Sequence, residues 1–136
     1  MSDPILIIPC SGIGKPLGTI GREAAYLVIE DLKKGETGTV CLSLLVMGDR
    51  EAQKLVESKR CIAVDGCASE CSKKNLQLKN AKLAASFRVL DVVKEYRELK
   101  PKSVTFLDED GRKIARHLAN RIASEIEELN KKESSK

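Results

Sequence analysis

The chain has 136 residues and a formal net charge of +4; 42% of its residues are hydrophobic and 32% are charged. This length and composition favour a single folded domain and exclude a disordered chain. Basic and acidic residues are interleaved and aromatic residues make up only 3%, so we expect no nucleic-acid partner.

The first third of the chain predicts a strand followed by a helix. Residues 4–9, PILIIP, form a short apolar run rich in β-branched residues, which suits a buried parallel strand. After a glycine-rich loop, residues 22–34 contain good helix formers, and Gly35 is placed to end that helix. A second strand could begin at Thr39, although residues 42–47 could equally begin a helix.

The same alternation continues through the middle of the chain. Residues 49–59 predict a helix with Asp49 as its cap, and residues 61–64, CIAV, predict another buried strand. Residues 69–82 then predict a third helix and residues 85–93 a fourth strand.

The last predicted element is an amphipathic helix over residues 111–129, because apolar residues recur there at spacings of three or four. These residues are Ile114, Leu118, Ile122, Ile126 and Leu129. Strands alternating with helices predict an α/β fold, a three-layer sandwich with a mostly parallel, roughly four-stranded sheet in a single domain. We assign residues 1–129 to this domain and expect residues 130–136 to form a disordered tail.

The cellular compartment bears on the five cysteines. The first ten residues, MSDPILIIPC, lack the basic region of a secretory signal, and no apolar run approaches the roughly 20 residues that span a bilayer. We therefore expect a cytoplasmic protein without a membrane segment. Because the cytosol is reducing and five is an odd number, clustered thiols indicate metal ligands or reactive groups rather than a disulfide framework.

Several cysteines are predicted to follow strands. Sites in open α/β sheets form at the carboxyl ends of the strands. Cys10 directly follows the first strand, and Cys67 follows another strand through Asp65 and Gly66, a glycine that could supply a positive φ for a sharp turn. Cys71 lies four residues further on, and at a helix start the helix dipole lowers the pKa of a thiol.

The other two cysteines differ from these. Cys61 opens the strand that Cys67 follows, so at about 3.3 Å per residue the two lie well over 10 Å apart and cannot share one ion. We expect Cys61 to be a small buried apolar residue. Cys41 joins the cluster if its strand ends near Val40, but it points elsewhere if the strand continues to Val46.

Spacing leaves two further alternatives open. Cysteine is among the most buried residue types, so Cys10 and Cys41 fit the core as well as they fit a site. The pair Cys67 and Cys71 also fits thiol redox or sulfur-transfer chemistry, with Cys67 as the activated thiolate and Cys71 as its resolving partner.

The ordered motifs carry a family resemblance. CSG at 10–12, CL at 41–42 and DGC at 65–67, followed by Cys71, resemble a bacterial and archaeal family named for its Asp-Gly-Cys motif, over about residues 5–92. The resemblance implies a zinc ion bound by four cysteines. These are Cys10, Cys41, Cys67 and Cys71.

A four-thiolate zinc site is closed and tetrahedral, as in structural sites, which argues against hydrolysis. We therefore expect a zinc-binding protein with an accessory or binding role, and leave open whether it has an enzymatic activity. Nearby Lys15, Lys73 or Lys74 could offset part of the site's net charge of about −2. Asp65 could orient a metal ligand or cap the following turn or helix, and the sequence does not favour either role over the other.

Other motifs add little. The glycine-rich segment departs from the Walker pattern at Pro16 and from the dinucleotide pattern at Leu17, so a tight turn is favoured over a small-anion site on residues 11–21. His117 is expected to be solvated or partly packed, without a metal role. The partners we expect are a metal ion and, as an open option, a protein of unknown identity.

Overall fold

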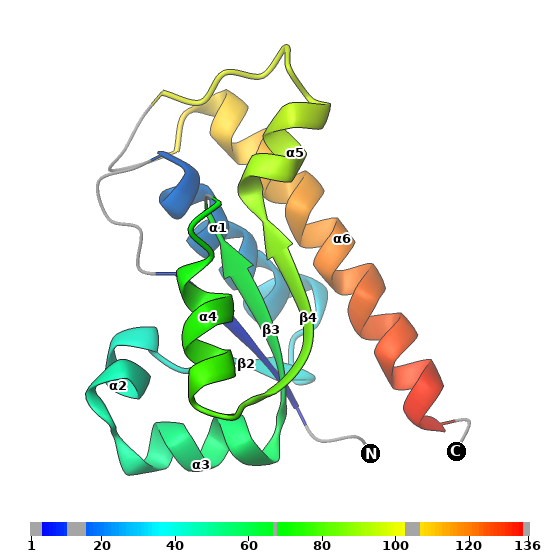
Figure 1. Cartoon of the computed structure of the whole chain (residues 1–136). Coiled ribbons are helices and arrows are strands. Elements are labelled where there is room, and N and C mark those ends of the chain that lie inside the picture. Colours follow the sequence, from blue (N-terminus) through cyan, green and yellow to red (C-terminus); the bar gives the residue numbers. More distant parts are fainter. Residues whose placement is uncertain (1–3, 11–15, 67, 103–106, 135–136) are drawn as a thin grey trace.

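A four-stranded parallel sheet forms the centre of the chain (Figure 1). The computed structural model describes residues 4–10, 16–66, 68–102 and 107–134. The strand order across the sheet is β2-β1-β3-β4, and each neighbouring pair is parallel. The strands are β1 (Ile5–Pro9), β2 (Thr37–Gly38), β3 (Arg60–Asp65) and β4 (Lys82–Arg88).

Helices cover both faces of this sheet. One face packs against α1 (Pro16–Leu27), α5 (Val89–Glu95) and α6 (Glu109–Ser134). The other packs against α2 (Leu42–Met47), α3 (Arg50–Ser58) and α4 (Cys71–Leu78). The predicted three-layer α/β sandwich with a parallel sheet is therefore confirmed.

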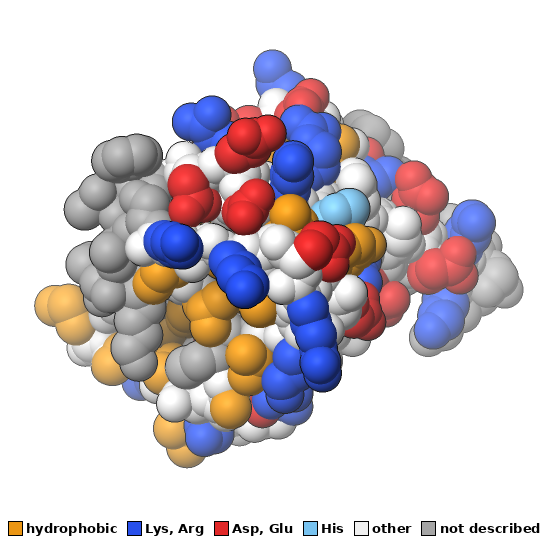
Figure 2. All heavy atoms as spheres, turned by 90° about the horizontal axis from the view of Figure 1, so that it is seen from above, with side chains coloured by type: hydrophobic (Ala, Val, Ile, Leu, Met, Phe, Trp, Pro, Cys, Tyr) orange, Lys and Arg blue, Asp and Glu red, His pale blue; other side chains and the backbone are white. Residues whose placement is uncertain are grey.

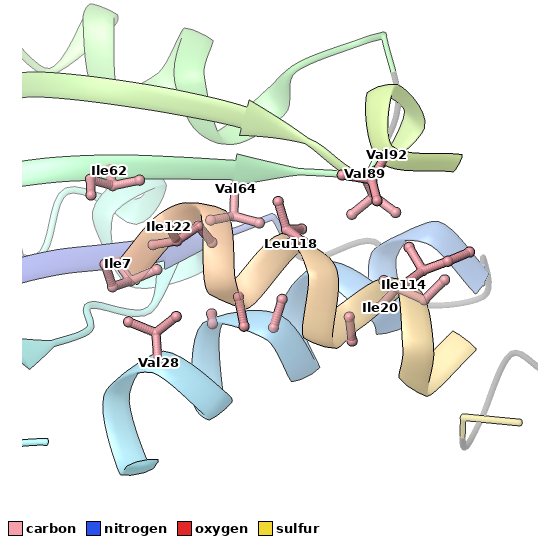
Figure 3. Close-up of a cluster of buried hydrophobic side chains, with 14 of the residues drawn as sticks. Ile7, Ile20, Val28, Ile62, Val64, Val89, Val92, Ile114, Leu118 and Ile122 are labelled. Carbon is pink, nitrogen blue, oxygen red and sulfur yellow. The ribbon is translucent and has the colours of Figure 1, made fainter. Parts of the chain in front are cut away.

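The two core clusters follow from the alternation of side chains along the strands. Ile5 and Ile7 of β1 belong to the α1–α6 cluster, whereas Leu6 and Ile8 belong to the cluster on the opposite face. Figure 3 shows part of the first cluster, in which strand residues meet a stripe along α6. The labelled α6 members are Ile114, Leu118 and Ile122.

Helix α1 begins at Pro16, well before the predicted start at residue 22. Proline suits the first turn of a helix because its missing N–H is not needed there. The helix then passes through Gly18 and Gly21, which the sequence analysis placed in a loop. Both glycines are buried, so close packing favours a helix that propensity alone does not predict. Gly35 has a φ of +83° just after the π-helical turn η1 (Val28–Leu32), as expected for a chain reversal.

Two other segments were ambiguous or wrongly predicted. The second strand ends at Gly38, and residues 42–47 form a helix, α2. Residues 85–93 were predicted as one strand, but the strand ends at Arg88 and α5 follows. Val89 and Val92, three residues apart, are both buried on one face of α5, which fits the helical period rather than the strand period.

Helix α6 continues to Ser134, beyond the predicted end at residue 129. The expected disordered tail is therefore helical as far as the structure describes it. Arg60 of β3 holds this last part, because its guanidinium donates to Asn130 at 3.0 Å and pairs with Glu133 at 2.9 Å. Across the described ranges, no helix combines the length and apolar character that a membrane span requires.

Candidate metal centre at the carboxyl edge of the sheet

Cys10 joins the ends of the two central strands. It follows β1, and its backbone N–H donates to the carbonyl oxygen of Val64 at 2.8 Å. Its Sγ accepts a hydrogen bond from the backbone N–H of Gly66 at 3.3 Å. The thiol of Cys10 therefore lies beside Gly66, the residue before Cys67 in the sequence.

Asp65 caps helix α4. Its carboxylate accepts hydrogen bonds from the backbone N–H groups of Ser72 at 2.7 Å and Lys73 at 3.1 Å. Burial raises the pKa of the Asp65 carboxyl, and these two N–H groups partly offset that rise. Of the two roles considered for Asp65, the cap is the one that the hydrogen bonds support.

A second contact ties the start of α4 to the sheet. The buried Ser72 hydroxyl donates to the carbonyl oxygen of Ile8 at 2.7 Å. Ser72 thus links the start of α4 to β1 and, through Asp65, to β3, while its neighbour Cys71, the first residue of α4, is exposed to solvent. The role of Ser72 was missed from the sequence, because nothing in the local pattern singles out this serine.

Gly66 is required for space rather than for an unusual backbone angle. The glycines with positive φ among the described residues are Gly35 and Gly48, so the positive φ suggested for Gly66 is not observed. A β carbon at Gly66 would lie 3.0 Å from the carbonyl carbon of Leu17 and 3.0 Å from the nitrogen of Gly18. The loop after β3 thus presses its backbone against the first turn of α1.

Cys41 lies at the same edge of the sheet. Because β2 ends at Gly38, the alternative of a long strand through Cys41 is wrong, and Cys41 instead precedes the first residue of α2. Its side chain makes no capping hydrogen bond, yet the backbone N–H groups of Leu44 and Ser43 lower the pKa of this exposed thiol. A lowered pKa favours the thiolate, which is the form that binds metals.

Cys61 is buried, as predicted, at the opposite end of β3. It pairs with Leu6 in the sheet, and its side chain is fully inaccessible. Burial raises the pKa of the Cys61 thiol to about 11. Its Sγ lies 3.3 Å from the carbonyl oxygen of Lys59, so the thiol donates a hydrogen bond to the residue just before β3.

The described cysteines do not by themselves complete a metal site. Cys10, Cys41 and Cys71 follow or flank strand ends at one edge, but Cys67 lies outside the described residues. Within the described part of the chain, no three His, Cys, Asp or Glu side chains are close enough to hold an ion. At this edge the structure places the thiol of Cys10 beside the backbone N–H of Gly66, Cys41 just before α2 and Cys71 at the start of α4.

These features define a parallel three-layer α/β domain with cysteines at the carboxyl edge of its sheet. The model of the DGC domain family matches residues 6–118, and the chain belongs to this family. The match extends beyond residue 92, where the resemblance was expected to end, and includes the first ten residues of α6, 109–118. No curated protein and no solved structure matches this chain.

Proposed function

We propose that this chain is a zinc-binding protein that holds one ion through four thiolates and serves an accessory or binding role. The proposed ligands are Cys10, Cys41, Cys67 and Cys71. Bound zinc would supply a structural cross-link between the loops at the carboxyl edge of the sheet. We expect the protein to act in the cytoplasm, where thiols remain reduced.

One observation carries this proposal. Cys10 and Cys41 follow adjacent parallel strands, and Cys71 begins the helix that Asp65 ties to the end of β3. Cys61, which lies at the other end of β3, is buried and has a raised pKa. Among the described cysteines, Cys10, Cys41 and Cys71 thus lie toward one edge of the sheet, whereas Cys61 belongs to the core.

The chemistry of this edge fits a thiolate site. The backbone N–H groups of Leu44 and Ser43 lower the pKa of Cys41 and so favour negatively charged sulfur there, while the sulfur of Cys10 accepts a hydrogen bond from the N–H of Gly66. The described ligands Cys10, Cys41 and Cys71 do not form a group close enough to hold an ion, so the proposal requires them to move together on metal binding, with Cys67 as the fourth ligand. The proposal therefore predicts that replacing Cys67 lowers the zinc content.

Metal analysis of protein purified anaerobically tests the proposal. We expect about one zinc per chain and a colourless protein, because four thiolates could otherwise hold iron or an iron–sulfur cluster that absorbs visible light. Single Cys→Ser changes at the four proposed ligands should each lower the zinc content, whereas Cys61→Ser and Cys61→Ala should retain it. A metal-free wild-type protein, or loss at Cys61 with retention at Cys10, would contradict the assignment.

The same preparations separate the thiol redox alternative. If Cys67 and Cys71 were a redox pair, metal-free protein would form a reversible disulfide between them, detectable by mass spectrometry after digestion. We expect zinc-loaded protein to resist this oxidation, because coordinated thiolates are unavailable for disulfide formation. Reversible pairing in a protein that never binds metal would favour the redox function.

A further inference from the structure

A groove lies between the start of α1 and the segment that leaves α5. Its volume is about 550 Å³, which is within the range of ligand-binding clefts. The groove is open to solvent along its length, so it suits an extended chain better than an enclosed small molecule. Its apolar lining consists of Pro16, Leu17, Val93, Leu99 and Pro101.

Three basic side chains line the same groove, namely Lys94, Arg97 and Lys100. All three residues are exposed, and none forms an ion pair with a carboxylate of the described residues. Among the described residues, the acceptor of the Arg97 side chain is the carbonyl oxygen of Lys94, at 3.4 Å. The cationic groups therefore remain available to a partner.

Neighbouring acids do not neutralise these cations. Asp91 and Glu95 of α5 pair with Arg88 and Arg121, which do not line the groove. Asp110 accepts a hydrogen bond from the backbone N–H of Lys100, at 2.9 Å, rather than from its ammonium group. Figure 2, which looks onto this end of the molecule, shows Lys and Arg side chains beside apolar ones on the same face.

We propose that this groove binds an acidic, leucine-bearing segment of a partner protein. The apolar lining would bury the leucine side chains, and the three cations would pair with flanking carboxylates. None of the described lining residues carries an aromatic ring on which a nucleic-acid base could stack, which disfavours single-stranded nucleic acid. The three cations favour a partner segment with negative charge. The apolar lining requires that the segment also carry apolar side chains.

The groove adjoins the Asp-Gly-Cys loop. Leu17, one of its lining residues, is also the residue whose carbonyl carbon would meet a β carbon at Gly66. A partner bound here would lie beside the candidate metal centre. The groove itself needs no metal, so this inference and the zinc proposal can fail separately.

Fluorescence anisotropy with the full chain tests the inference. The probe is a fluorescein-labelled ten-residue peptide with two central leucines flanked by Asp and Glu. Control peptides replace the acids with Asn and Gln, or the leucines with Ser. We expect saturable binding of the probe that weakens at least tenfold between about 50 and about 300 mM salt, and at least tenfold weaker binding of both controls.

Matched charge reversals locate the binding. The triple variant Lys94→Glu, Arg97→Glu and Lys100→Glu should weaken probe binding at least tenfold. A control with the same charge change at exposed sites away from the groove should bind as the wild type does; it carries Lys34→Glu, Arg50→Glu and Lys54→Glu. Circular dichroism confirms that both variants fold.

Several results would overturn the proposal. These are no saturable binding of the probe, equal binding of either control peptide, or an equal loss in the two triple variants. Tighter binding of phosphatidylserine vesicles or of a mixed-sequence single-stranded oligonucleotide, lost in the groove variant, would instead assign the groove to a membrane or a nucleic acid. Zinc content measured on the same samples keeps this outcome separate from that of the metal proposal.

Discussion

Gly66 lies against the first turn of α1, where the space for a side chain is missing. The atoms that a β carbon would meet belong to the backbone of Leu17 and Gly18, which cannot turn aside as a flexible side chain can. The glycine of the Asp-Gly-Cys motif is therefore explained by packing between the β3 loop and α1. The N–H of the same glycine donates to the sulfur of Cys10.

Replacing Gly66 tests this close approach. We expect Gly66→Ala to lower the free energy of unfolding by about 1–3 kcal/mol, because the backbone must shift to admit the methyl group. Urea denaturation measures the change. Gly38→Ala is the matched control, since its nearest contact would be the Leu6 side chain at an ordinary 3.6 Å. Equal stability of Gly66→Ala and the wild type would refute the packing explanation.

Cys61 is predicted to be chemically silent in the folded protein. Its side chain is inaccessible, and burial raises the pKa of the thiol to about 11, so almost no thiolate is present near neutral pH. Iodoacetamide at about pH 8 should leave Cys61 unmodified in the native protein and label it only after denaturation. Mass spectrometry after digestion identifies the labelled positions.

The exposed thiols of Cys41 and Cys71 are internal controls for this experiment. In metal-free native protein both should be labelled while Cys61 stays intact. Labelling of Cys61 at the rate of the exposed thiols would show that the core cluster around it opens readily. It would also remove the distinction on which the ligand assignment depends.

At the scale of the elements, aspartate side chains cap the starts of two helices, α3 and α4. Asp49 caps α3 by accepting a hydrogen bond from Ala52 at 3.0 Å, as its position in the sequence predicted. Asp65 caps α4 in the same way but from a distance of seven residues, across the Asp-Gly-Cys loop. The second cap fixes a helix to a strand end, and so it orders the edge that carries the cysteines.

The two caps give a matched pair of variants. Asp49→Ala and Asp65→Ala should each lower the free energy of unfolding by about 1–2 kcal/mol, because backbone N–H groups lose their acceptor. Of the two variants, only Asp65→Ala should also lower the zinc content, because Asp65, unlike Asp49, caps the helix that begins with Cys71. Denaturation curves and metal analysis on the same samples measure both effects. Equal zinc loss in the two variants would point to general destabilisation.

At the scale of the whole molecule, α6 spans the face of the sheet and ends beside the start of β3. Its buried stripe closes the larger core cluster, and its last turns reach Arg60 through Asn130 and Glu133. The end of the helix is therefore attached to the sheet by polar contacts at the surface. Such contacts contribute modestly compared with the stripe itself.

Truncation measures this attachment. A chain ending at Leu129 should keep its fold and lose about 1 kcal/mol of unfolding free energy, because the ion pairs Arg60–Glu133 and Lys131–Glu128 and the hydrogen bond from Arg60 to Asn130 are removed. Denaturation in urea gives the value. Arg60→Ala should cost less in the truncated chain than in the full chain, since part of its interactions is already absent. A truncated chain as stable as the full one would mean that the last turns contribute nothing.

The elements that sequence reasoning identified are those whose pattern is local. The apolar run of β1, the cap at Asp49 and the stripe from Ile114 to Ile126 each depend on neighbours within a few residues. The wrongly predicted elements have one cause: their conformation depends on packing against segments that are distant in the sequence. Helix α1 includes glycines because the β3 loop and α5 pack closely against it, and α5 replaces a predicted strand because Val89 and Val92 face the core.

By itself, the sequence determined the α/β class, the order of its strands along the chain and the separation of Cys61 from the other cysteines. These follow from hydrophobic period and from the length of a strand, which are properties of short segments. Only the tertiary structure decided that Asp65 is a helix cap, that Gly66 is needed for space and that three cations surround an apolar groove. Each of these depends on atoms brought together from separate parts of the chain, and residue spacing does not record that proximity.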